Sequence, residues 1–164
     1  MRFEPIFRTP TAWSVVARRF GVHLFEGKVT VADMERMERL GADWYSTHPG
    51  RLVELVVVFP SDTRMSTDER HRMARLIKRW EKDRDASATV ILAEGMMGAV
   101  HRSVLTGLLL FAPPPHPAKV FGTVPAAVTW LAPYVHALCG TDATTEQLLA
   151  GVDALCSEFR ARAP

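Results

Sequence analysis

The chain has 164 residues, a length that suits one domain with a full hydrophobic core. Hydrophobic residues make up 48% and charged residues 23% of it, as in ordinary globular proteins. The net charge of +2 is too small to attract nucleic acid strongly. Two cysteines, Cys139 and Cys156, do not make a disulfide framework or a four-cysteine metal site.

The first part of the chain predicts two strands, a helix and a central strand. Residues 13–29, WSVVARRFGVHLFEGKV, are rich in Val, Phe and Trp and indicate two short strands joined by a turn near Gly21. Thr30 precedes an amphipathic helix, VADMERMERLGADWYSTH, and has the spacing of a capping box with Asp33 in its first turn; a Pro-Gly pair ends the helix. The apolar run LVELVVVF, residues 52–59, is typical of a strand covered on both faces.

The middle of the chain continues the alternation of helix and strand. Residues 67–84 predict a helix with one apolar stripe and many basic residues, and residues 88–94 predict a buried strand. MMGAVHRSVLTGLLLFA, residues 96–112, is helical by length and composition, and a proline-rich loop separates it from a short strand at 118–122.

The last part predicts two further helices. Thr123 caps the first of them, and Pro133 is expected to end or bend it. A polar linker, GTDATTEQ, then leads to a capping box at Thr144 and an amphipathic helix. We therefore divide the chain into an α/β domain, residues 1–140, and a linker with a C-terminal helix, residues 141–164. The apolar stripe of that helix consists of Leu148, Leu149, Val152, Leu155, Cys156 and Phe159.

Strands that alternate with helices imply a mixed, mostly parallel sheet with right-handed crossovers. We expect four to five strands, flanking helices, an antiparallel pair at one edge and the extra C-terminal helix. No secretion signal is recognisable, and the most apolar stretch, VLTGLLLFAPPP, is about ten residues long against the ~20 that a membrane span needs. We therefore expect a cytoplasmic protein without an integral membrane segment.

This element order, over roughly residues 13–138, resembles the STAS domain of bacterial anti-sigma-factor antagonists and of the cytoplasmic tails of sulfate transporters. In the antagonists, a strand of the LVVVF type leads to Asp-Ser-(Ser/Thr)-Gly at a helix start, and the Ser accepts phosphate from a partner kinase, the anti-sigma factor. Met65, Ser66, Thr67 and Asp68 occupy the equivalent positions here. The resemblance implies Ser66 as phosphate acceptor and Thr67 as the hydroxyl after it, although Met65 replaces the Asp and Asp68 the Gly.

The same residues have a purely structural interpretation. Ser66 and Glu69 form the S-x-x-E pattern of a capping box, which needs no partner. A phosphate at Ser66 or Thr67 would lie against the carboxylates of Asp68 and Glu69, although the helix N-terminus favours negative charge. We favour the cap over the phosphorylation switch.

The carboxyl ends of the inner strands are where open α/β sheets bind ligands. The candidates for a ligand pocket there are Ser61, Glu94, His101 and Thr123. Glu94 with His101 could act as an acid–base pair, and Ser61, His101 and Asp62 as a hydrolase triad. A lone histidine on an apolar helix is more often a core residue, and Ser61 lacks a G-x-S-x-G context. We therefore expect no catalysis.

We also expect no metal and no cofactor. The histidines form no H-x-x-x-H pair, the cysteines form no C-x-x-C pair, and no glycine-rich nucleotide loop is present. The six histidines, far apart in sequence, are His23, His48, His71, His101, His116 and His136.

The most favoured function is that of a non-catalytic regulatory or protein-interaction domain of STAS type. The basic helix is expected to be a solvated or partner-facing surface, not a nucleic-acid site, because acidic residues dilute it. The C-terminal helix packs on its own sheet or, as the alternative, joins two chains into a homodimer. A second hypothesis is a small-ligand or lipid pocket between sheet and helices, and a third is a phospho-switched anti-sigma-factor antagonist. The candidate partner surface consists of Asp62, Arg64, Asp68, Arg70 and Arg72.

Overall fold

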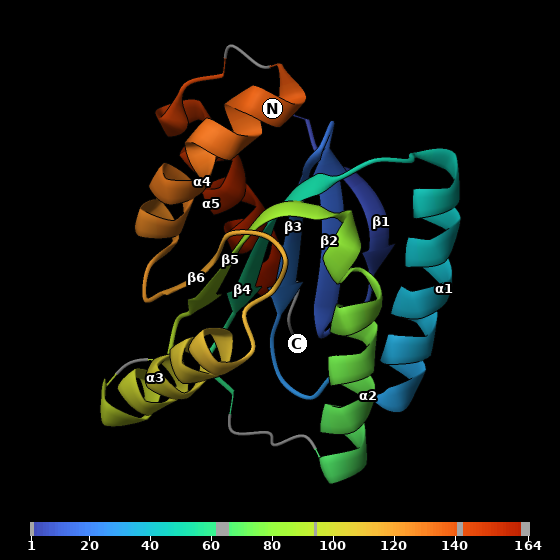
Figure 1. Cartoon of the computed structure of the whole chain (residues 1–164), viewed down its shortest axis with the longest axis vertical. Helices are drawn as coiled ribbons and strands as arrows, with labels where there is room; N and C mark the ends of the chain where they lie inside the picture. Colours follow the sequence, from blue (N-terminus) through green and yellow to red (C-terminus); the bar gives the residue numbers. More distant parts are fainter. Residues whose placement is uncertain (1, 62–65, 94, 141–142, 162–164) are drawn as a thin grey trace.

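The computed structural model describes residues 2–61, 66–93, 95–140 and 143–161. Among these residues, no helix combines the length and the apolar character that crossing a membrane requires. In chain order (Figure 1), they form β1 (Glu4–Arg8), β2 (Ala12–Ala17), β3 (Phe20–Phe25), α1 (Val31–Thr47), β4 (Leu52–Val58), α2 (Thr67–Arg79), the 3₁₀ turn η1 (Glu81–Asp83), β5 (Arg84–Ile91), α3 (Gly95–Phe111), β6 (Ala118–Phe121), α4 (Val124–Cys139) and α5 (Thr145–Ala161).

The described residues form one sheet of six strands, ordered as in the sequence. β1, β2 and β3 pair antiparallel, whereas β3 to β6 pair parallel. The α/β class and the mixed sheet are confirmed, but the expected count of four to five strands is wrong. The additional strand is the edge strand β1, EPIFR. Its proline and its charged ends are not typical of a strand, so its sequence does not predict one. Pairing with β2 makes it a strand.

Two boundaries differ from the sequence prediction. The turn between β2 and β3 lies at Arg18 and Arg19, with Arg18 at a φ of 56°, whereas Gly21 lies inside β3 opposite Val16. Helix α2 ends at Arg79, and β5 begins at Arg84 instead of residue 88. Arg84 joins the sheet because it pairs with β4, a long-range contact that local sequence does not reveal.

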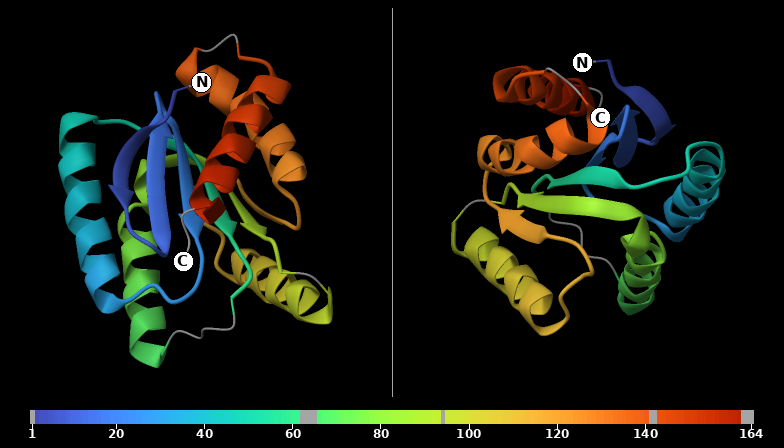
Figure 2. Two further views of the ribbon diagram at one scale, coloured as in Figure 1. Left: turned by 180° about the vertical axis from the view of Figure 1, so that it is seen from behind. Right: turned by 45° about the horizontal axis from the view of Figure 1, so that its top comes forward.

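Helices α4 and α5 cover one face of the sheet, and α1, α2 and α3 lie on the other (Figure 2). The larger core lies under α4 and α5, where Val53, Leu55 and Val57 of β4 are buried. Alternate residues of the same strand, Glu54 and Val56, point to the α1–α2–α3 side. The sheet thus carries a fully packed face and a second face whose covering is less complete.

Pro133 does not end its helix: α4 runs on to Cys139. Proline removes one backbone hydrogen bond, but Leu131, Ala132 and Val135 around it are buried against the sheet, and this packing outweighs the local cost. Gly140, at a φ of 53°, then ends the helix in the left-handed conformation.

The apolar stripe of α5 is buried within the chain. Leu148, Val152, Leu155 and Phe159 belong to the larger core, and the rings of Phe159 and Trp13 form a T-shaped pair at a centroid distance of 5.4 Å. A homodimer through this helix would therefore have to use its exposed face.

Candidate functional site

A cavity of about 360 Å³ lies over the less covered face of the sheet, between α2 and α3. Its size falls in the lower range of small-molecule pockets. The apolar walls come from both helices and its floor from β4 to β6. The residues that define it best are Met73 and Ile77 of α2, Leu105 and Leu109 of α3, and Val56 and Val58 of β4.

The apolar lining of the cavity is partly exposed. Ile77 of α2, which lines it, is about half exposed. Exposed apolar groups that border a concavity are typical of a binding site. Figures 1 and 2 show α2 and α3 standing apart on this side of the sheet, which leaves the strands between them without a helix above.

An ion-pair network forms a polar border of the cavity. Glu54 of β4 is buried between His23 of β3, whose Nε2 lies 3.0 Å from Oε1, and the guanidinium of Arg84 of β5, which meets both carboxylate oxygens. Burial alone would raise the pKa of Glu54, but Arg84 and His23 outweigh it and lower the pKa to about 2. Glu54 is therefore ionised, and the charge of Arg84 is compensated within the protein.

Ser87 and His116 lie at the same border. Ser87 of β5 is the parallel register partner of Glu54, and its Oγ lies 2.9 Å from Nε2 of His116 in the proline-rich loop. Burial, together with the charge of Arg84, lowers the pKa of His116, so the imidazole is neutral at neutral pH. A hydroxyl and a neutral imidazole can orient an uncharged polar group through hydrogen bonds.

The same two groups could in principle act as nucleophile and base. Ser87, however, lies in the middle of β5, and its backbone N–H donates to the carbonyl of Pro117. A catalytic serine in an α/β sheet typically lies on a sharp strand-to-helix turn, where the attacked group can reach it. The geometry therefore favours binding over acyl transfer.

Sequence reasoning missed this cluster, although one signal was present. Glu54 is the single charge in the run LVELVVVF, and a buried carboxylate needs partners. The partners themselves come from β3, β5 and a loop, so only the fold identifies them as His23, Arg84, Ser87 and His116.

The Ser66 capping box is confirmed. The Ser66 Oγ accepts the N–H of Glu69 at 3.2 Å, and Glu69 Oε2 accepts the N–H of Ser66 at 2.7 Å. Lys28 adds an ion pair to Glu69 at 3.1 Å, and the hydroxyl of Thr67, an exposed residue, accepts a hydrogen bond from Arg70. Phosphorylation of Ser66 or Thr67 stays a prediction.

The candidate partner surface is described in part. Asp68 and Arg70 are exposed on the first turns of α2, and Arg72 reaches Glu35 of α1 at 3.1 Å. Asp62 and Arg64 lie outside the described residues.

The strand-end candidates are not all brought together. Thr123 caps α4 and lines a second hollow of about 600 Å³ beside Arg102, which donates to the carbonyls of Ile91 and Ala93. Ser61 and His101 are exposed and line neither hollow. Glu94, like Asp62, lies outside the described residues, so the structure does not test the disfavoured acid–base pair and triad that involve them.

The comparisons with known proteins concern the fold. No family model matches the chain, and no curated protein matches it. A crystal structure of an uncharacterized DUF3478-family protein from Shewanella loihica PV-4, described as having a SpoIIAA-like fold, matches with a TM-score of 0.55 and 18% identity over 79% of this chain and 92% of that one. The protein therefore has a SpoIIAA-like, that is STAS-like, α/β fold.

Proposed function

We propose that this STAS-like protein is a non-catalytic binding module that holds a small, mainly apolar molecule between α2 and α3. The observation that carries the proposal is the cavity over β4 to β6, with apolar walls from both helices. A ligand there would remove apolar surface from water, the dominant favourable term in such binding. A ligand pocket was the second hypothesis from the sequence. The cavity supports it over the first hypothesis, a protein-interaction domain, for which a flat surface was expected.

The polar border defines the chemistry of the ligand. The charge of Arg84 is already matched by Glu54, so a carboxylate on the ligand would find no free cation there. Ser87 and His116 are both uncharged and can donate or accept hydrogen bonds. We therefore infer a ligand with an apolar body and one uncharged polar group, such as a long-chain alcohol.

Displacement of the neutral dye Nile red tests the proposal, with dodecanol and dodecanoate as competitors. Dodecanol is expected to displace the dye more effectively than dodecanoate. Ala118→Phe, which fills the floor of the cavity, should lower dye affinity by about tenfold or more, because it removes the apolar volume that the dye occupies. Ala126→Phe, on an exposed position of α4 across the sheet, is the matched control and should leave it unchanged.

Two outcomes would contradict the proposal. Equal dye affinity in the folded Ala118→Phe and Ala126→Phe proteins would place the dye outside the cavity. Stronger displacement by dodecanoate would refute the uncharged polar group. Circular dichroism and thermal unfolding of both variants establish that each one is folded before affinities are compared.

A further inference from the structure

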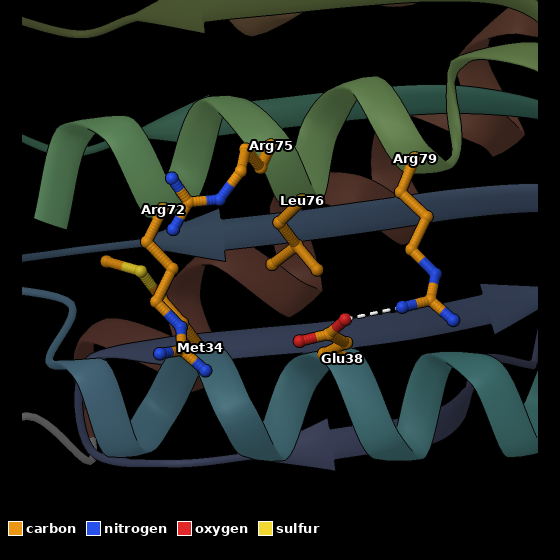
Figure 3. A pocket seen from close by; sticks show the side chains of 6 residues that line it. All are labelled: Met34, Glu38, Arg72, Arg75, Leu76 and Arg79. Carbon is orange, nitrogen blue, oxygen red and sulfur yellow. Dashed lines mark hydrogen bonds and ion pairs between the residues drawn. The ribbon is translucent and has the colours of Figure 1, made fainter.

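A groove between α1 and α2 combines an apolar floor with three arginine side chains (Figure 3). Met34 of α1 and Leu76 of α2 form the floor and are 1% and 6% exposed. Arg72, Arg75 and Arg79 project from α2 around a space of about 360 Å³. This groove is distinct from the ligand cavity, which lies on the side of α2 that carries Met73 and Ile77.

The groove has an excess of positive charge. Helix α2 carries five Lys or Arg residues and only two acidic ones, and one of those, Glu69, already pairs with Lys28. In the groove itself, Arg79 pairs with Glu38 of α1, as Figure 3 shows. Among the described residues, Arg75 has neither a hydrogen-bond nor an ion-pair partner. An anionic ligand can supply an ion-pair partner for Arg75 and can pack on the apolar floor beside it.

The existing ion pairs are easily exchanged. Arg72 with Glu35 and Arg79 with Glu38 are partly exposed, with side-chain exposures of 33% and 59% in the first pair and 56% and 39% in the second. Exposed pairs of this kind contribute about 0–1 kcal/mol, so carboxylates of a partner can replace the glutamates of α1 at little cost. Three guanidinium groups are therefore accessible to an acidic partner.

The spacing of the arginines along α2 indicates how acidic residues would be arranged in a partner peptide. Arg72 and Arg79 are two helical turns apart, about 10 Å along the axis. A chain in the polyproline II conformation covers that length in about three residues and, with three residues per turn, directs residues i and i+3 to the same side. Two acidic residues three positions apart would meet the outer arginines, and an apolar residue between them would lie on Met34 and Leu76.

We propose that the α1–α2 groove binds an acidic peptide segment of a partner protein, with two carboxylates on the arginines of α2 and an apolar side chain on the floor. The proposal goes beyond the cavity ligand and does not depend on it. Charge complementarity favours this occupant over a second copy of the chain, whose net charge of +2 would add repulsion.

Fluorescence anisotropy with labelled peptides tests the groove. The probe is GSEALEGS, in which the glutamates are three positions apart, and GSEEALGS has the same composition with adjacent glutamates. Arg75→Glu should weaken binding of the probe by about tenfold, because it places a carboxylate against the carboxylates of the peptide. Lys78→Glu is the matched control: it makes the same charge change on the same helix, at an exposed residue outside the groove.

The expected result is that the probe binds more tightly than GSEEALGS and that only Arg75→Glu weakens it strongly. Equal binding of the two peptides, or equal losses in Arg75→Glu and Lys78→Glu, would show diffuse electrostatic attraction and overturn the proposal. Tighter binding of a single-stranded oligonucleotide would overturn it in favour of nucleic acid. Nile red affinity should be unchanged in Arg75→Glu, which separates this site from the cavity.

Discussion

At the residue scale, Glu54 is the buried charge whose ion pairs make the stability of the protein depend on pH. It interrupts an apolar strand, and its burial is tolerated because Arg84 and His23 hold both carboxylate oxygens. Its pKa is about 2 in the folded protein, against an ordinary value of 4.5. Because the folded pKa is the lower one, ionised Glu54 stabilises the fold above pH 4.5, and this contribution is lost as the pH falls towards 2.

This predicts the pH dependence of stability in Glu54→Gln. The native protein should lose about 3 kcal/mol of unfolding free energy through Glu54 between about pH 5 and 2. In Glu54→Gln, the unfolding free energy should depend less on pH in this range. The variant should be about 3 kcal/mol less stable at neutral pH, because it leaves Arg84 buried without its anion. Urea unfolding at a series of pH values measures both effects.

Glu158→Gln is the control for this experiment. Glu158 pairs with Arg8 at 3.5 Å and its side chain is 40% exposed, so the loss at neutral pH should stay below about 1 kcal/mol. If Glu54→Gln keeps the slope of the native protein, the ion-pair network is not the source of the acid sensitivity.

At the scale of the element, the first turn of α3 closely approaches Ala93, in the connection that follows β5. A Cβ on Gly98 would lie 1.8 Å from the carbonyl oxygen of Ala93, so the helix start has no room for a side chain there. Gly107, farther along the same helix, would place its Cβ within 4 Å of nothing. Because α3 forms one wall of the cavity, its position also decides the shape of the site.

Alanine at these two glycines should therefore have opposite effects. Gly98→Ala should destabilise the protein by about 1–3 kcal/mol and weaken Nile red binding, because the start of α3 must move. Gly107→Ala should stabilise it by about 0.5–1 kcal/mol, since alanine is the better helix former. Denaturant unfolding with dye titration measures both, and equal effects of the two substitutions would show that the contact with Ala93 does not position α3.

At the scale of the whole molecule, α5 completes the core that the sheet and α4 share. Phe159 is 1% exposed, and its ring packs on Trp13 of β2 and Phe59 after β4. The C-terminal helix thus closes the packed face of the sheet, whereas the cavity lies over the opposite face.

Phe159→Ala should cost about 3–5 kcal/mol of unfolding free energy, because it leaves a cavity in this core. Leu149→Ala, at a half-buried position of the same helix, should cost less. Urea unfolding measures the loss, and sedimentation equilibrium monitors the oligomeric state. A change from dimer to monomer in Phe159→Ala without loss of stability would instead identify the stripe as an interface between chains.

The sequence by itself determined the features that depend on neighbours within a turn or two. The helix starts at Thr30, Ser66, Thr123 and Thr144 were predictable because a capping side chain bonds to the backbone two or three residues on. The central strand was predictable because a continuous apolar run has few alternatives to burial in a sheet.

Only the tertiary structure decided the edge strand β1, the continuation of α4 through Pro133 and the contents of the site. Pairing with a neighbouring strand or packing against the core overrode local preference in the first two cases. In the third, parallel register places Ser87 opposite Glu54, and helix placement leaves the floor around them open. Strand register and helix position arise from contacts distant in sequence, so no local pattern could have joined Glu54 to Ser87 and His116.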